Sequence, residues 1–278
     1  MVTVDTSSLT VPVGILRIVE VVLSCVTFSL VASAGHVNSS YWAWCMFTWC
    51  FCCFVTLIII ILELTSLSAR APISWNDFTT AFAMLATLMV LSASVIYSVF
   101  ISRSASGKNI AAAVISFLCF LAYAVEVSWT RARPGEISGF LATVPGLLKV
   151  VETFVACIIF ISLGSIGHGA YSSYPGLQWC VAVYSICFIF ALIIIILTIG
   201  RMLPLLPFPF DKVLTGYNVL AVLMYMTAVV IWPLYSYENN AKRSNDWAVV
   251  TAMTCVNLIA YIVDTIYSVR LVFFITPA

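Results

Sequence analysis

The sequence predicts an all-α integral membrane protein whose chain crosses the bilayer eight times, as two tandem four-helix units. Three observations lead to this fold class. The 278 residues are 63% hydrophobic and 8% charged, eight apolar stretches are long enough to span a bilayer, and the second half of the chain repeats features of the first. A soluble domain has about 25% charged residues and would aggregate with so much apolar surface exposed, whereas lipid accommodates that surface.

The predicted spans each contain at least the roughly 20 mostly apolar residues that cross a hydrocarbon layer of about 30 Å. Their residues do not alternate in polarity, as the strands of a membrane β-barrel would. Short segments of turn-forming and charged residues separate them. In chain order, the predicted spans are Val13–Ala34, Tyr41–Leu64, Phe78–Ile101, Ile110–Trp129, Pro145–Ser165, Gln178–Ile199, Val213–Tyr235 and Trp247–Phe274.

The basic residues favour a topology with both termini in the cytosol, because short cytosolic loops carry an excess of Lys and Arg. This topology also places Asn38, the first residue of an Asn-Ser-Ser glycosylation sequon, in a short outer loop, where we expect weak glycosylation. The inner side would hold Arg17, Arg70, Arg131, Arg133, Lys149, Arg201, Lys212 and Arg270, and the outer side would hold Arg103, Lys108, Lys242 and Arg243.

An internal repeat divides the chain into two similar halves. The segment Gly14–Glu20 (GILRIVE) recurs as Gly146–Glu152 (GLLKVVE), and three further matches follow in the same order, each 132–138 residues apart. We therefore expect one four-helix unit in residues 1–135 and a second in residues 136–278. Because four spans return the chain to the side where it began, the copies should be parallel.

Charged residues recur at one depth within the predicted spans. Helical spacing of three and four residues puts polar side chains on one stripe of the first, fourth and eighth spans. Since lipid offers no partners to these stripes, they should face other helices, about 7–10 Å inside the cytosolic boundary. The predicted intramembrane polar layer consists of Arg17, Glu20 and Glu126 in the first unit and Lys149, Glu152 and Asp264 in the second.

Two interpretations of this layer remain open. In the structural interpretation, charge pairs join the first and last helices of each unit: Glu126 approaches Arg17 or Glu20, and Asp264 approaches Lys149 or Glu152. In the functional interpretation, the carboxylates relay protons or bind a cation. The layer lies near one face and no acidic residue reaches the middle of the membrane, which favours the structural interpretation. Glu63 corresponds to Thr198 in the repeat, so it is not part of the repeated pattern.

Several function classes find no support in the sequence. No P-loop, GxSxG or HExxH motif is present, so we expect no enzyme, no catalytic residues and no cofactor. The ten cysteines lie in apolar stretches without the spacing of a zinc site, so we expect no metal. The net charge of +1, without a basic stripe, argues against nucleic acid as a partner.

Four stretches resemble the myeloid-associated differentiation marker family. They are Trp129–Ile137 (WTRARPGEI), Ala142–Val150 (ATVPGLLKV), Met46–Phe51 (MFTWCF) and Trp232–Tyr235 (WPLY). The resemblance implies two tandem MARVEL domains, each a four-helix membrane unit. It also implies a non-enzymatic role in organising cholesterol-rich microdomains, membrane apposition or vesicle traffic, at the plasma membrane or in endomembrane vesicles. The implied partners are membrane lipids, cholesterol among them, and other membrane or cortical proteins.

The loop Arg131–Gly146 joins the two repeats and is the predicted docking surface for cytosolic partners or anionic headgroups. Arg131 and Arg133 lie beside the membrane, where each basic residue contributes about 1 kcal/mol of attraction to acidic lipid. The alternative function, a small transporter or channel that uses the inner-leaflet carboxylates, would require a water-filled path through one of the units.

Overall fold

The computed structural model describes residues 11–68, 73–101, 107–132, 143–167, 169, 172–200, 202, 209–238 and 245–272. Most of the loop Arg131–Gly146, including Arg133, lies outside these residues. The chain forms two compact units that divide between residues 138 and 139. Among the described residues, eight helices are long and apolar enough to cross a membrane, which confirms the predicted fold class.

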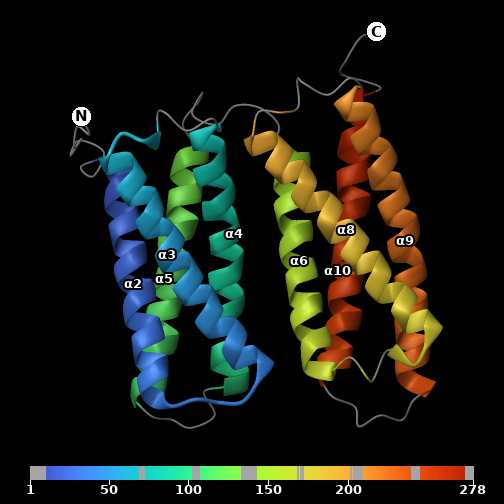
Figure 1. Cartoon of the computed structure of the whole chain (residues 1–278), viewed down its shortest axis with the longest axis horizontal. Helices are drawn as coiled ribbons and strands as arrows, with labels where there is room; N and C mark the ends of the chain where they lie inside the picture. The colour runs from blue at the N-terminus through green and yellow to red at the C-terminus, as the bar shows by residue number, and fades with distance from the viewer. Residues whose placement is uncertain are drawn as a thin grey trace. The chain divides into compact units, whose positions relative to one another are not determined.

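The first unit is a bundle of four long helices (Figure 1, blue to green). Helix α2 packs on both α5 and α3, and α4 packs on α3 and α5, so the four helices close into a ring in which the first lies beside the last. The helices are α2 (Pro12–Ala34), α3 (Ser40–Leu64), α4 (Trp75–Ile96) and α5 (Gly107–Ala132).

The second unit repeats this arrangement (Figure 1, yellow-green to red). Helix α6 packs on α10 and α8, and α9 packs on α8 and α10, so the first and last helices are again neighbours. The helices are α6 (Val144–Ile166), α8 (Pro175–Ile199), α9 (Phe210–Glu238) and α10 (Asn245–Arg270).

Helix ends follow local sequence signals. Helix α2 has a proline in its first turn, where the missing N–H costs nothing, and it ends before Gly35, whose φ of 110° suits glycine. In α6, Thr143 caps the start by accepting a hydrogen bond from the Gly146 N–H at 3.3 Å, and Gly167 follows the end with a φ of 86°. These signals mark the ends of α2 and α6.

All eight helices begin one to three residues before the predicted spans, and α4 and α10 continue beyond their α-helical parts as π-helix. Helix α4 begins at Trp75 rather than Phe78 and continues as a π-helical turn, η2 (Tyr97–Ile101). The Tyr97 hydroxyl of this turn donates a hydrogen bond to Asn109 Oδ1 on α5 at 3.1 Å. The α-helical part of α10 ends at Arg270 and residues 271–272 continue as π-helix, whereas Phe274, the predicted end, lies outside the described residues.

The bundles have apolar exteriors and polar residues in their interiors. Of the buried residues on α2, only Val31 has a large apolar side chain, whereas Ile15 on the opposite face is 53% exposed. The remaining buried residues of α2 are Gly14, Arg17, Glu20, Ser24 and Thr27. A water-soluble helix has the opposite arrangement, so this helix is suited to lipid outside and polar partners inside.

Aromatic side chains fill the remaining interior of each unit. In the second unit, Tyr184, Tyr225 and Trp232 are fully buried, and the ring of Tyr184 contacts the rings of both others. In the first unit, Tyr123 packs in a smaller cluster with Phe82 and Cys119. Buried Tyr and Trp need a partner for their polar atoms; Tyr184 finds one in the Thr254 hydroxyl at 2.8 Å.

Candidate functional site

The polar layer of the first unit is centred on Arg17. The residues Arg17, Glu20 and Ser24 share the inward face of α2 because they are three and four positions apart. The Nε of Arg17 donates to Glu126 Oε1 on α5 at 2.7 Å, and its Nη1 donates to Glu63 Oε1 on α3 at 2.5 Å. One guanidinium therefore binds carboxylates from two neighbouring helices.

Further hydrogen bonds surround this ion pair. Trp75 on α4 donates its indole N–H to Glu63 Oε1 at 2.9 Å, which brings the fourth helix into the network. Farther along the bundle, the Ser24 hydroxyl and the Cys119 thiol lie 3.2 Å apart between α2 and α5. All four helices of the first unit thus contribute polar side chains to its interior.

Lys149 on α6 is the centre of the polar layer in the second unit. It is 0% exposed, and its Nζ lies 2.7 Å from Glu152 Oε2, 2.7 Å from Asp264 Oδ2 and 2.8 Å from Asn218 Oδ1. Three acceptors match the three N–H donors of an ammonium group. The ammonium also lies over the rings of Tyr217 and Tyr261, 5.1 and 4.8 Å from their centroids.

Asn218 on α9 joins the second layer into one network. Its amide donates to Asp264 Oδ2 at 2.9 Å and to Ser268 Oγ at 3.1 Å, and its carbonyl accepts from Lys149. Asp264 and Ser268 both lie on the inward face of α10. The network therefore connects α6, α9 and α10 through buried side chains.

The structure brings together most of the predicted layer. Glu126 contacts Arg17 and Asp264 contacts Lys149, each between the first and last helices of its unit. Glu20 is buried at the same level, but neither of its carboxyl oxygens has a hydrogen-bond partner. Arg131 is exposed in the last turn of α5, and Arg133 lies outside the described residues.

Sequence reasoning missed two members of these networks. Glu63 was set aside because its counterpart in the repeat is Thr198, yet it binds Arg17. Asn218 was overlooked, although an Asn inside an otherwise apolar span is itself a signal of a buried polar contact. Both residues lie on helices whose sequences show no long polar stripe.

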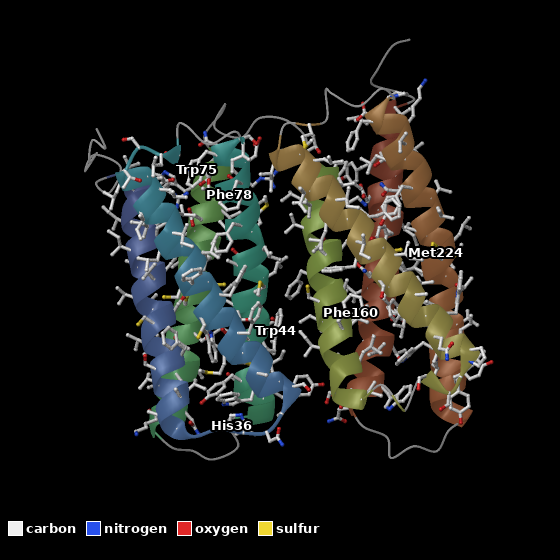
Figure 2. All side chains as sticks on the ribbon, viewed as in Figure 1. His36, Trp44, Trp75, Phe78, Phe160 and Met224 are labelled. Carbon is white, nitrogen blue, oxygen red and sulfur yellow. The ribbon has the colours of Figure 1, made fainter. Side chains whose placement is uncertain are left out.

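The two ends of the first unit carry different features. Figure 2 shows Trp75 and Phe78 at one end of this unit and His36 at the other. The Glu63 carboxylate belongs to the Trp75 end, since Trp75 binds it. Asn38 is exposed in the segment between His36 and the cap of α3, where Ser39 Oγ accepts from the Tyr41 N–H at 3.3 Å. The sequon and the polar layer are therefore at opposite ends.

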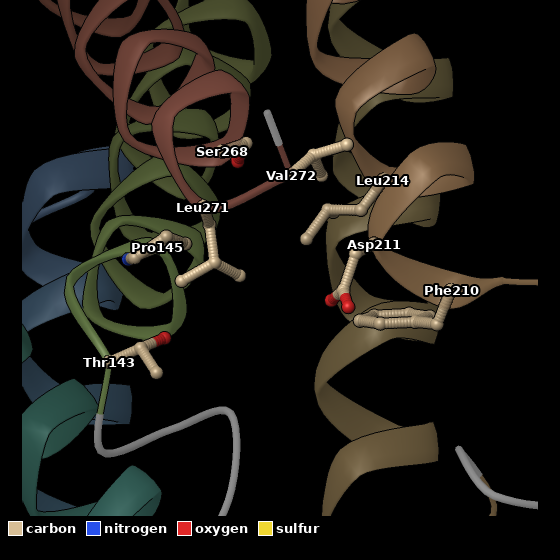
Figure 3. Close-up of a pocket in the computed structure, with 8 residues that line it drawn as sticks. All are labelled: Thr143, Pro145, Phe210, Asp211, Leu214, Ser268, Leu271 and Val272. Atoms are coloured by element: carbon tan, nitrogen blue, oxygen red, sulfur yellow. The ribbon is translucent and has the colours of Figure 1, made fainter. Parts of the chain in front are cut away.

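A mostly apolar pocket of about 250 Å³ opens in the second unit (Figure 3). It lies where α6 and α9 begin and α10 ends, next to the polar layer, because Ser268 belongs to both. Its lining consists of Thr143, Pro145, Phe210, Asp211, Leu214, Ser268, Leu271 and Val272. In the part of the chain that the structure describes, no group of three or more His, Cys, Asp or Glu side chains could hold a metal ion.

Helical bundles that bury their charges and expose apolar faces define a multi-pass membrane protein. Comparison with known proteins identifies the family. The sequence profile of MARVEL, described as a membrane-associating domain, matches residues 8–129 and again residues 140–267. These two matches correspond to the two four-helix units. No solved structure matches the chain.

Curated relatives extend over nearly the whole chain. The human protein "Myeloid-associated differentiation marker" is 48% identical, with 96% of this chain and 90% of that protein aligned. A "Myeloid-associated differentiation marker homolog" of Xenopus laevis is 46% identical (97% and 95% aligned), and the human "Myeloid-associated differentiation marker-like protein 2" is 41% identical (96% and 94% aligned). The chain therefore belongs to the myeloid-associated differentiation marker family of tandem MARVEL membrane proteins.

Proposed function

We propose that the chain is a non-enzymatic organiser of membranes, which gathers lipids and neighbouring membrane proteins into microdomains or at sites of membrane apposition and vesicle traffic. The observation that carries this proposal is the distribution of polarity in each bundle. Arg17 and Lys149 face inward and are bound by side chains of their own unit, whereas large apolar side chains face outward.

This distribution of polarity supports a role in which the protein acts by contacting lipids and other helices rather than by binding and moving a substrate. A transporter needs polar groups that its substrate can reach, and a lipid-organising protein needs apolar faces that acyl chains and other helices can pack against. Helix α5 has such a face along its whole length. Its exposed apolar residues are Ile110, Val114, Phe117, Leu118, Leu121, Val125 and Trp129.

We also propose a cytosolic location for both termini and for the end of each unit that contains the polar layer. Arg131 would then lie at the inner surface, where it attracts anionic headgroups or acidic partners. Cholesterol and cortical proteins are the partners that the family resemblance implies.

The experiment combines partitioning with transport. The fluorescently tagged protein is followed in phase-separated vesicles derived from the plasma membrane, and the purified protein is tested in liposomes for proton and cation flux. We expect enrichment in the ordered phase and a flux no greater than that of empty liposomes. A uniform distribution with a protein-dependent flux would instead support the transporter alternative.

A matched pair of variants tests whether the outward faces act through contact. Shortening Phe117 and Leu121 of α5 to Ala removes lipid contacts, and shortening the buried Tyr184 to Phe leaves the outer surface unchanged. We expect only the α5 variant to lose enrichment in the ordered phase. Equal enrichment of both variants would contradict a role for the α5 face.

A further inference from the structure

Glu20 is a buried acid without a partner. It is 0% exposed on the inward face of α2, and both of its carboxyl oxygens lack a hydrogen bond. It follows Arg17 by three residues, so the two side chains lie on the same side of the helix. Nevertheless, the described ion pairs of Arg17 are with Glu63 and Glu126.

In the second unit, the acid at the position equivalent to Glu20 is Glu152, and it does have a cationic partner. Glu152 also follows its basic residue by three positions, and its Oε2 lies 2.7 Å from Lys149 Nζ. The difference arises on the second helix of each unit. Glu63 of α3 binds Arg17, whereas its counterpart Thr198 of α8 turns its hydroxyl back to the Ile194 carbonyl at 2.8 Å. The additional carboxylate of α3 occupies the guanidinium, and Glu20 is left without a cation.

Among the residues that the structure describes, the neighbours of Glu20 supply no positive charge other than Arg17. Glu126 of α5 faces it, and its other titratable neighbours across the bundle are Cys52, Cys119 and Tyr123. The Cys119 thiol is engaged with Ser24, and the Tyr123 hydroxyl lies 2.7 Å from the Thr56 hydroxyl.

The charges in this layer do not balance. Arg17 is the one cation among the described residues of the first polar layer, and three carboxylates surround it: Glu20, Glu63 and Glu126. An ionised carboxylate in an apolar interior without a partner costs several kcal/mol. Two carboxyl groups that face each other without a cation between them can share one proton instead.

We propose that the first unit contains a proton-binding site in which Glu20 carries the proton beside the ionised Glu126. The proton comes from a hydronium ion of the surrounding water, which is left as a water molecule, and it forms an O–H bond at Glu20, so the step needs no other reactant. A proton suits the site better than a metal ion, because a metal ion needs several oxygen ligands and the Glu20 oxygens have no further polar group bound to them. Loss of this proton would place two negative carboxylates face to face between α2 and α5, so the α2–α5 contact depends on it.

Infrared spectroscopy of the protein in lipid nanodiscs tests the proposal directly. A protonated carboxyl group has a carbonyl stretch separate from the amide bands, and ¹³C labelling of the glutamate carboxyl groups shifts this stretch without any substitution. We expect the unsubstituted protein to show a glutamate band of this kind, Glu20→Gln to lose it in part or whole, and the control Glu152→Gln to retain it. Glu152 binds Lys149 in the second unit and is therefore not part of the Arg17 layer. The absence of a labelled band, or an unchanged band in Glu20→Gln, would overturn the proposal.

Thermal unfolding provides an independent measurement. Gln has the shape and neutrality of a protonated Glu, so Glu20→Gln should unfold at the same temperature as the unsubstituted protein or at a higher one. Glu126→Gln removes an acceptor of Arg17 and should unfold at a lower temperature. Failure of Glu20→Gln to fold, or a sodium- or potassium-dependent melting temperature that this variant abolishes, would show that Glu20 is ionised and would overturn the proposal.

Discussion

Arg17 and Lys149 occupy equivalent positions of the repeat, and these two buried cations find their partners in different ways. The guanidinium of Arg17 extends to carboxylates on two helices, as its planar fork of donors allows. The compact ammonium of Lys149 binds three acceptors at once and lies over two tyrosine rings. Each cation is thereby bound by carboxylates of its own unit.

Sequence spacing predicted contacts between the first and last helices of each unit, but it did not predict every neighbour of these residues. Helical spacing placed Arg17, Glu126, Lys149 and Asp264 at one level, and the structure shows the pairs Arg17–Glu126 and Lys149–Asp264. Spacing along a helix does not give the rotation of one helix against another. For that reason the contribution of Asn218 could not be derived from its position alone.

Asn218 should be important for the stability of the second unit. Asn218→Leu keeps the branched shape of the side chain but removes hydrogen bonds to Lys149, Asp264 and Ser268. We expect a loss of about 1–3 kcal/mol in unfolding free energy. The measurement is thermal or denaturant unfolding in detergent, with the lipid-facing Leu220→Ala of the same helix as the control. Equal losses for the two variants would contradict the network.

Whole helices follow from the sequence more reliably than their ends. The polar stripes predicted the inward faces of α2, α5 and α10, because polar groups in a bilayer must find protein partners. The π-helical turn after α4 makes contacts such as the hydrogen bond from Tyr97 to Asn109, which an apolar run does not predict. An apolar run indicates that a span exists but not where its last turn unwinds.

The start of α8 packs closely against the end of α9. A Cβ added at Gly176 would lie 2.5 Å from Tyr235 Cε2, whereas one added at Gly164 in α6 would meet nothing within 4 Å. Gly176→Ala should therefore displace the Tyr235 ring and destabilise the unit by about 1–3 kcal/mol. Gly164→Ala is the matched control and should be neutral or slightly stabilising, since Ala favours a helix by about 1 kcal/mol. Unfolding in detergent compares the two; a stable Gly176→Ala variant would contradict the close contact.

At the scale of the whole chain, the repeat was the most informative feature of the sequence. Matches 132–138 residues apart predicted two four-helix units, and the MARVEL profile matches twice. The boundary at residues 135 and 136 stays a prediction, because residues 133–142 lie outside the described part of the chain. The organising role cannot be read from the repeat, since an apolar outer face does not specify which lipid or protein it meets.

The proposed topology has both termini in the cytosol. Epitope tags at either end should resist protease added to intact cells and become accessible after the membrane is permeabilised. The basis is the distribution of Lys and Arg between the loops. A tag that is digested in intact cells would contradict this topology.

The basic end of the first unit should contribute to binding at the inner surface. Under the proposed topology, replacing Arg131 and Arg133 by Gln removes two positive charges at the inner surface, each contributing about 1 kcal/mol toward acidic lipid. We expect weaker recovery of neighbours in proximity labelling and weaker microdomain partitioning, with the tag assay confirming an unchanged topology. Unchanged recovery and partitioning would leave the two arginines with a role in topology alone.

Unfolding of Arg17 variants tests most directly whether buried charge pairs hold the first and last helices of a unit together. Arg17→Leu alone leaves Glu63 and Glu126 without their cation and should reduce unfolding free energy by about 3–5 kcal/mol. Combining it with Glu63→Gln and Glu126→Gln removes the stranded charges. We therefore predict that the triple variant is more stable than Arg17→Leu in the same detergent. If the losses in unfolding free energy simply add from one substitution to the next, the charges are not coupled. That result would contradict the claim that buried charge pairs hold these helices together.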